Sequence, residues 1–293
     1  MSKLTFGEKV YQVFNYAFLT LLAFMTLYPF LYVIFASFSN PVKLYTHEGL
    51  LLYPQGFTTR AYEMVLKDPR IVTGYANTIF YVVVGTALNI IMSCIGAYVL
   101  SRPYLKLRRF FTIMIVFTMY FGGGLIPHYL LVKSLHLDNT RWALIVPGLI
   151  NTWNLIIMMT AFRNVPISLD ESARIDGAGE WRILFQIVLP LVVPTIMVMV
   201  LYCAVGHWNS WFNAMIYLRD RGKYPLQLFL REILVENRLN EITAGQGQAN
   251  EVEDVGTTIK YATIIVSTVP ILLVYPFIQK YFVHGVMIGA IKG

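Results

Sequence analysis

The chain has 293 residues, of which 57% are hydrophobic and only 13% are charged. Soluble domains carry roughly a quarter charged residues, so this chain has too few charges to cover a water-facing surface of its size. Its net charge of +7 comes from short basic clusters between apolar runs, which is typical of membrane topology and not of a nucleic-acid-binding face. The composition therefore excludes an ordinary soluble domain. It favours an all-α integral membrane protein that has lipid, and no nucleic acid, as a partner.

Six apolar segments are long enough to cross a bilayer, which takes about 20 helical residues. In chain order they run from Val13 to Phe38, Tyr75 to Leu100, Phe110 to Val132, Trp142 to Phe162, Ile187 to Trp211 and Ile259 to Phe282. The first is too long for the apolar core of a signal peptide, so we expect it to remain as a helix. The sequence thus predicts six transmembrane helices in a single domain that covers residues 1–293.

Basic clusters near the ends of the segments predict the orientation of the chain. Lysines precede the first segment, four basic residues lie in the connection 102–109, and further arginines lie between the fourth and fifth segments. With six spans these clusters share one side, which the positive-inside rule assigns to the cytoplasm. Lys and Arg counted over every loop divide almost evenly, but long loops weigh less in the rule. We therefore expect both termini in the cytoplasm.

Ionisable side chains are almost absent from the predicted spans. His207 lies well inside the fifth segment, and His128 lies near the end of the third. A charge at the bilayer centre costs on the order of 3 kcal/mol, so proton-coupled carriers keep such groups only for function. A lone histidine more often bonds to a neighbouring helix. Cys94 and Cys203 lie in apolar runs and are interpreted as small buried apolar residues. The sequence therefore predicts neither ion coupling nor a metal site.

A short helix is predicted in the connection between the fourth and fifth segments. Ser168 and Glu171 have the spacing of a capping box, and Asp170 and Arg174 are four residues apart and could pair on one face. Gly177 suits the left-handed residue that commonly ends a helix. On these features alone, a surface helix that merely links two spans explains the pattern.

The wider spacing in this connection resembles the Glu-Ala-Ala loop of ABC importer permeases. Glu171-Ser172-Ala173 is followed after three residues by Gly177, and after nine more by Ile187-Val188-Leu189-Pro190. Ser172 replaces the usual first alanine, which is a small-for-small change. The resemblance implies the type I ABC importer permease fold, with a core at about residues 73–282 and a coupling helix at about residues 168–177.

The coupling helix of that family docks in a cleft of an ATPase subunit. By position, the docking residues here would be Glu171, Ser172, Ala173 and Gly177. The chain has no Gly-x-x-x-x-Gly-Lys-Ser/Thr phosphate loop, so we expect it to be no enzyme and to hold no cofactor. ATP and Mg would be bound by separate subunits. The implied partners are a homologous second permease subunit, two ATPase subunits and an extracytoplasmic solute-binding protein, in the bacterial cytoplasmic (inner) membrane.

Further motifs resemble carbohydrate importer permeases of the maltose type. They are Asn77-Thr78, the stretch Ala97-Tyr98-Val99-Leu100-Ser101-Arg102, and the C-terminal residues 285–293. The stretches 120–127 and 205–213 resemble the branch that handles oligosaccharides and uronides, and an alginate-oligosaccharide importer subunit is one identity that fits them. The resemblance implies import of a sugar by alternating access. It also implies that part of 240–256 reaches into the docked binding protein.

Two groups of aromatic and amide residues suit a sugar pathway, because aromatic rings stack on sugar faces and amides bond hydroxyl groups. They are Asn151, Trp153 and Asn154 in the fourth segment, and Trp208, Asn209 and Trp211 at the outer end of the fifth. An interfacial aromatic belt with amide bonds between helices would give the same pattern, and it is the more frequent explanation.

Three other functions stay open at this point. A secondary transporter or channel would need no ATPase, but the sparse charge and the loop motif speak against it. A membrane-embedded enzyme would need a nucleophile cluster, a carboxylate pair or a His-Glu-x-x-His motif, and the sequence offers no convincing one. An ABC importer permease for a peptide or amino acid is disfavoured only by the weaker branch motifs.

Overall fold

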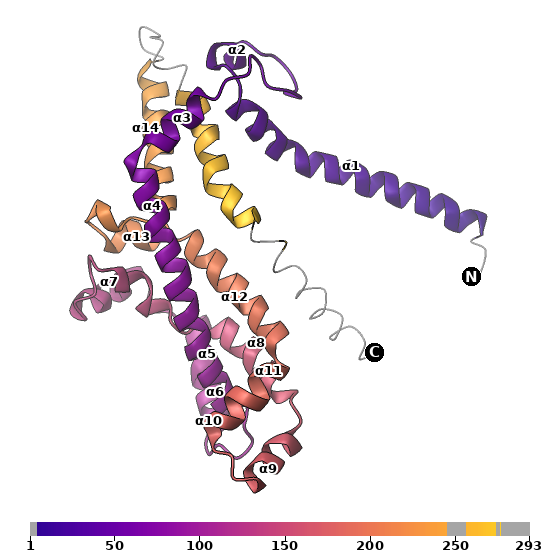
Figure 1. Cartoon of the computed structure of the whole chain (residues 1–293), viewed down its shortest axis with the longest axis vertical. Helices are drawn as coiled ribbons and strands as arrows, with labels where there is room; N and C mark the ends of the chain where they lie inside the picture. Colours follow the sequence, from indigo (N-terminus) through magenta and orange to yellow (C-terminus); the bar gives the residue numbers. More distant parts are fainter. Residues whose placement is uncertain (1–4, 245–255, 274–275, 277–293) are drawn as a thin grey trace. The chain divides into compact units, whose positions relative to one another are not determined.

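The computed structural model describes residues 5–244, 256–273 and 276, which form helices and short connections without a strand among them (Figure 1). They divide into two compact units. One contains the described residues within 1–69 and 232–269, and the other contains those within 70–231 and 270–293. The predicted all-helical fold class is confirmed over the described residues.

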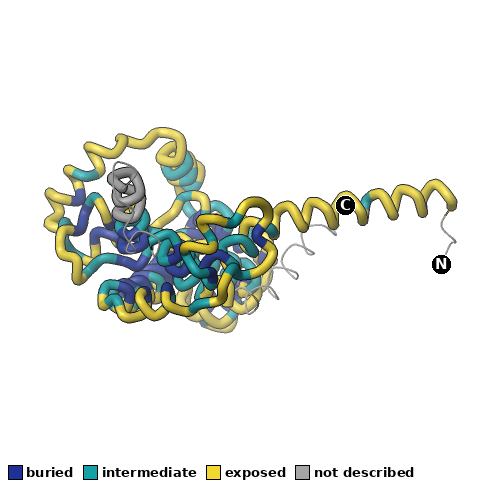
Figure 2. Tube along the Cα trace, turned by 90° about the horizontal axis from the view of Figure 1, so that it is seen from above, coloured by how far each residue is buried: buried dark blue, intermediate teal, exposed yellow. Residues whose placement is uncertain are grey.

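The first unit begins with the apolar helix α1 (Phe6–Ser37), which contains the first predicted span. A capping box starts the helix: the Thr5 amide donates to Glu8 Oε2 at 2.6 Å, and the Glu8 amide donates to Thr5 Oγ1 at 3.4 Å. Of this helix only Ala36 and Ser37 are buried, and Figure 2 shows its length almost entirely exposed. An apolar helix that is exposed on all sides requires lipid or a partner helix around it.

After α1 the chain of the first unit forms α2 (Pro41–Tyr45) and α3 (Arg60–Lys67). Aromatic contacts hold this segment to the end of α1, where the Phe38 ring stacks on Phe57 and on Tyr62 with centroids 5.5 Å and 4.7 Å apart. The helix Gly256–Leu273 belongs largely to the same unit, and its Tyr261 ring contacts Tyr32 edge-on at 5.8 Å.

The second predicted span is one unbroken apolar helix of 33 residues, Pro69–Ser101. It comprises α4 (Pro69–Phe80), the π-helical turn η1 (Tyr81–Gly85) and α5 (Thr86–Ser101). It begins earlier than predicted. α5 packs against α8 (Thr152–Arg163) and α12 (Val193–Trp208), and buried residues of these helices form the larger apolar core of the second unit.

The third, fourth and fifth predicted spans are each bent, which the sequence analysis did not predict. In the third span, α6 (Arg108–Tyr120) and α7 (Leu125–Ser134) meet at 115°. In the fourth, the 3-10 turns η2 (Arg141–Leu144) and η3 (Val146–Gly148) precede α8, which is bent from them by 48°. In the fifth, a first segment made of α10 (Glu180–Arg182), η4 (Ile183–Val188) and α11 (Leu189–Leu191) is followed by α12 at an angle of 85°. Gly124 at φ +84° and the prolines Pro147, Pro190 and Pro194 explain why regular helices stop there. By length and composition, the described residues supply three helices able to span a membrane, or up to six if each bent pair is one span.

The remaining helices are α9 (Ile167–Ile175), α13 (Phe212–Tyr217), the 3-10 turn η5 (Arg221–Lys223) and α14 (Leu226–Ala244). Within the second unit, α9 and α10 lie at one end of α5, and α7 and α13 lie near its other end (Figure 1). We call these the α9 end (residues 98–105 and 165–184) and the α13 end (residues 74–89, 128–149 and 207–231).

Three predictions fall partly or wholly outside the described residues. The sixth span is described only within Gly256–Leu273. The C-terminal stretch 285–293 and most of the loop segment 240–256 lie outside.

Candidate functional site

The helix α9 occupies the predicted coupling position, but its first turn differs from the prediction. The helix begins at Ile167 after Pro166, and no side chain caps it, so the predicted Ser168–Glu171 capping box is wrong. A capping box needs its serine just outside the helix in extended backbone, whereas Ser168 already lies inside the helix.

The last turn of α9 confirms the predicted role of Gly177. Gly177 has φ +77°, its amide donates to the Arg174 carbonyl at 3.0 Å, and the Ala178 amide donates to the Ala173 carbonyl at 2.9 Å. This pair of hydrogen bonds is a Schellman motif, which satisfies carbonyls at the end of a helix. The chain therefore turns sharply at Gly177 and enters α10.

The predicted docking residues do not share one surface. Glu171, Ser172 and Gly177 are exposed, and a Cβ placed on Gly177 would meet nothing within 4 Å. Ala173 is buried in the core that α5 and α8 form. Ile175 is 87% exposed. The surface open to a partner is therefore formed by Glu171, Ser172, Ile175 and Gly177.

The charges of α9 pair with residues outside the helix. Asp170 and Arg174 were predicted to pair with each other, but Asp170 pairs with Arg102 and Arg174 pairs with Glu180. Asp170 Oδ2 lies 2.7 Å from Arg102 Nη1, and the two side chains are 1% and 3% exposed. The predicted pair does not form because Asp170 faces the end of α5 and Arg174 faces the start of α10.

The Arg102–Asp170 pair is incompletely satisfied. Among the residues that the structure describes, Arg102 Nε and Nη2 and both oxygens of Asp170 have no hydrogen-bond partner, because the close contact is off the line of a hydrogen bond. The Arg102 guanidinium also lies over the Tyr98 ring, with Cζ 4.4 Å from the centroid. Burial raises the pKa of the Asp170 carboxyl, and the positive charge of Arg102 opposes that shift. Removing two charges from water is costly, so the pair is a poor source of stability.

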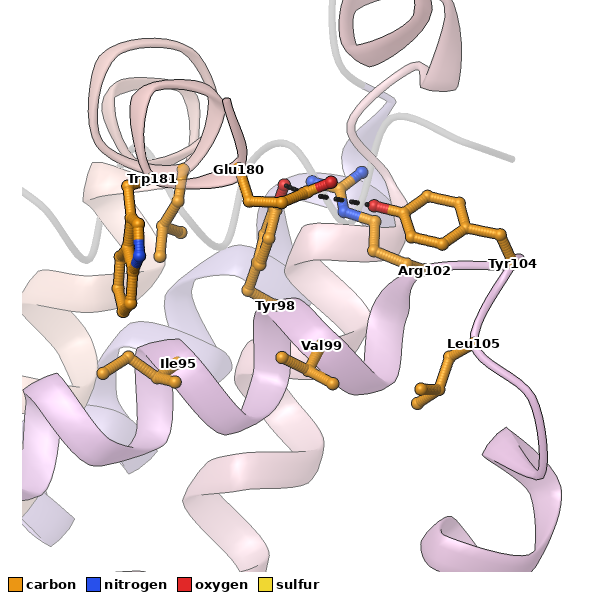
Figure 3. Close-up of a pocket in the computed structure, with 9 residues that line it drawn as sticks. Ile95, Tyr98, Val99, Arg102, Tyr104, Leu105, Glu180 and Trp181 are labelled. Atoms are coloured by element: carbon orange, nitrogen blue, oxygen red, sulfur yellow. Dashed lines mark hydrogen bonds between the residues drawn. The ribbon is translucent and has the colours of Figure 1, made fainter. Parts of the chain in front are cut away.

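A second, partly exposed polar network surrounds Glu180, and Figure 3 shows Tyr98, Tyr104 and Glu180 of this network beside a cavity of about 380 Å³. Glu180 Oε2 accepts from the Tyr98 hydroxyl at 2.7 Å and from the Tyr104 hydroxyl at 3.4 Å. Its other oxygen pairs with Arg174, whose guanidinium lies 4.7 Å from the centroid of the Tyr104 ring. The network thus connects α9, α10 and the end of α5.

Amide side chains organise the α13 end. The Asn77 amide nitrogen donates to the carbonyls of Gly222 and Tyr224 at 2.8 and 3.1 Å, and its oxygen accepts from Arg141 at 2.8 Å. The Tyr81 hydroxyl donates to the Lys223 carbonyl at 2.7 Å. These contacts satisfy carbonyls of the η5 turn, which has no regular helix partner.

Asn89 and His207 form a second amide centre within the unit. The Asn89 amide nitrogen donates to the carbonyls of Gly148 and Leu149 at 2.6 and 2.9 Å, and its Oδ1 lies 2.7 Å from His207 Nε2. The prediction that the lone histidine bonds to a neighbouring helix is confirmed. Gly85 allows the approach, since a Cβ there would lie 2.5 Å from His207 Nε2.

Asn151, Trp153 and Asn154 lie at the start of α8. Asn151 caps α8 by accepting from the Asn154 amide at 3.1 Å. The Asn154 side chain donates to Cys203 Sγ of α12 at 3.4 Å, and Trp153 is 59% exposed. Trp153 therefore presents an open ring face.

Trp208, Asn209 and Trp211 lie at the end of α12. Trp208 is buried against Tyr75 with ring centroids 6.3 Å apart, and the Asn209 side chain donates back to the Val205 carbonyl of its own helix at 3.0 Å. The Trp211 ring lies under the guanidinium of Arg231 at 4.3 Å. These contacts resemble helix packing more than an open sugar site.

Sequence reasoning quoted the motif that contains Tyr98 and Arg102 but gave neither residue a role. It also assigned no role to Glu180 or Asn89. Two features of the sequence could have pointed to Arg102 and Asn89: the arginine directly follows an apolar span, and the asparagine lies inside that span. Polar groups that become buried at such positions require partners. The partners themselves come from segments far away in the sequence.

Comparison with protein families places most of the chain in one of them. Residues 90–288 match the family described as binding-protein-dependent transport system inner membrane component. The polygalacturonan/rhamnogalacturonan transport system permease protein YtcP of Bacillus subtilis (strain 168) is 40% identical over 291 residues, which are 98% of this chain and 99% of that protein. Protein LplC of the same organism is also 40% identical, over 99% of this chain and 97% of that protein.

Solved structures give the same result. A chain from the crystal structure of a bacterial ABC transporter involved in the import of the acidic polysaccharide alginate superposes with a TM-score of 0.86 and 33% identity, over 96% of this chain and 100% of that one. A chain from a bacterial alginate ABC transporter in complex with an alginate pentasaccharide-bound periplasmic protein is similar in fold alone, with a TM-score of 0.57 and 14% identity. This chain is a membrane protein and a transport permease, and it belongs to the family of binding-protein-dependent transport system inner membrane components.

Proposed function

We propose that the chain is a membrane-spanning permease subunit of an ATP-driven, binding-protein-dependent importer, and that it translocates an acidic oligosaccharide by alternating access. Full-length similarity to a polygalacturonan/rhamnogalacturonan permease and to an alginate importer chain supports the choice of substrate. Both substrates contain uronic acid units, so a carboxylate-bearing sugar is their shared chemistry.

The helix α9 is the coupling element in this proposal. It is short and ends in a sharp turn at Gly177, and its open surface carries the acidic Glu171 and the apolar Ile175. A basic, cleft-bearing partner fits such a surface. The α9 end then lies in the cytoplasm together with both termini, and ATP and Mg are bound and hydrolysed by two separate ATPase subunits. A homologous permease and an extracytoplasmic solute-binding protein complete the importer.

The substrate pathway is expected along α8 and α12, with Trp153 as its best candidate in this chain, because its ring is 59% exposed. Asn151, Asn154, Trp208, Asn209 and Trp211 are kept as weaker candidates, since their polar or aromatic groups already contact the protein.

Purification of the native complex tests the assignment. The binding protein loaded with oligogalacturonate or alginate oligosaccharide should stimulate ATP hydrolysis, and neutral maltooligosaccharide should not. Import into proteoliposomes without any ATPase subunit would overturn the proposal. Stimulation by neutral sugar alone would overturn the acidic substrate and leave the importer intact.

The variant Glu171→Ala tests the coupling role of α9. We expect reduced co-purification of the ATPase subunits and loss of import, because an exposed charge at the docking surface is removed. Glu48→Ala is the matched control, since Glu48 is also exposed but lies far from α9 in the sequence. Normal import and normal ATPase association of Glu171→Ala would contradict the role.

A further inference from the structure

Arg102 joins the end of α5 to the first turns of α9. It is the residue at which α5 ends, and its side chain is 3% exposed. Asp170, its partner, is the buried neighbour of the exposed Glu171. Two adjacent residues of α9 therefore have different surroundings, since Glu171 lies on the open surface and Asp170 points into the unit.

The pair is costly compared with an apolar alternative. Its guanidinium and carboxylate leave buried atoms without hydrogen bonds, and burial alone raises the pKa of the carboxyl. Well-packed apolar side chains of similar volume often stabilise a fold at least as well as a buried ion pair. A charged pair does, however, impose one relative position on its two helices, because a small displacement leaves both charges buried and unpaired.

The surroundings of α5 explain where such a constraint acts. α5 makes its main helix contacts with α8 and α12, and Tyr98 and Leu100 belong to the same buried core as Ala173 of α9. A movement of α5 is therefore passed to the apolar centre of the second unit, which is close-packed and transmits displacement.

We propose that Arg102 is a positioning residue for energy coupling: through Asp170 it holds α9 to the last turn of α5, so that a displacement of α9 moves α5 and the helices packed on it. The inference rests on the proposed function of α9 as the coupling helix. It separates docking, which Glu171 performs, from transmission, which the buried pair performs.

The test uses the complete importer in proteoliposomes with its binding protein and labelled oligogalacturonate. The variants are Arg102→Lys, Asp170→Asn and the double variant Arg102→Met/Asp170→Leu. Arg109→Met is the control, on an exposed arginine in the first turn of α6. Thermal stability, co-purification of the ATPase subunits and sugar imported per ATP hydrolysed are measured for each.

We expect the double variant to keep its ATPase subunits and a Tm near that of the wild type, because no buried charge is left unpaired. Its import per ATP should fall about tenfold, within the range of typical coupling effects. Arg102→Lys should retain most of the wild-type import per ATP because it keeps a positive charge. Arg109→Met should behave as wild type. Asp170→Asn should lose both stability and coupling.

A double variant that imports as much sugar per ATP as the wild type would overturn the inference, since the pair would then only balance charge. A double variant that fails to assemble would also overturn it, because the pair would then be a folding element. If Glu171→Ala imports normally and keeps its ATPase subunits, the proposed coupling role of α9 itself fails. If Glu171→Ala loses import while the double variant stays coupled, only the role of Arg102 fails.

Discussion

The two ends of the second unit solve the burial of polar groups in different ways. At the α13 end, the neutral amides of Asn77 and Asn89 bond to backbone carbonyls of irregular segments, and nearly all of their hydrogen-bonding capacity is used. At the α9 end, opposite charges meet in the Arg102–Asp170 pair, and several of their atoms stay without hydrogen bonds.

This difference indicates different tasks. A satisfied amide centre has one favoured arrangement and holds irregular backbone in place, which a lipid-facing protein requires wherever a helix is broken. The energy of a charged, incompletely hydrogen-bonded pair changes with the relative position of the two helices that carry it. The α13 end is therefore expected to behave as a fixed support, and the α9 end as the place where displacement is passed on.

The largest expected effect follows from filling the space at Gly85. Gly85→Val should cost about 3 kcal/mol of stability, because even its Cβ would overlap the His207 ring, which Asn89 holds in place. Thermal unfolding of the purified complex measures the loss. Gly206→Ala on α12 is the matched control, because a Cβ there meets nothing within 4 Å. Equal stability of the two variants would mean that the close helix approach at Gly85 is not needed.

Removing the amide of Asn89 should have the next largest effect. Asn89→Leu leaves the Gly148 and Leu149 carbonyls and His207 without their partner, at a cost of about 2 kcal/mol. The loss should be seen as a lower Tm with an unchanged ratio of import to ATP hydrolysis. As a control, Asn209→Leu should leave Tm nearly unchanged, since the side chain of Asn209 is exposed and, among the described residues, bonds only to the Val205 carbonyl of its own helix. A change in the coupling ratio of Asn89→Leu would break the contrast between the two ends.

The smallest effect is expected for the exposed pair Arg174–Glu180. Both side chains are well exposed, at 40% and 49%, so Glu180→Gln should change stability by about 0–1 kcal/mol. High salt should reduce the difference between variant and wild type further, because it screens exposed charges. Unfolding measured at low and high salt checks this. A large, salt-independent loss would show that the exposed network belongs with the buried pair.

Part of this molecule could be predicted from local sequence. The first five apolar segments, the short helix predicted at about 168–177 and observed at Ile167–Ile175, and the turn at Gly177 were predicted correctly, because span length and left-handed glycine turns depend on neighbouring residues. The bends within three spans were not predicted. Glycine and proline marked the positions, but whether a helix continues past them depends on which partners take up the freed backbone groups.

The partner of Asp170 could not be predicted from the local sequence and is set by the tertiary structure. Spacing along α9 offered Arg174, four residues away, and local rules favour that pair. The folded unit instead buries Asp170 against the end of α5, where Arg102 is the charge within reach. Sequence by itself determined that the chain is helical, apolar and built to lie in lipid. Only the tertiary structure decided which charges meet, because burial of one face of α9 depends on helices that are distant in the sequence and adjacent in space.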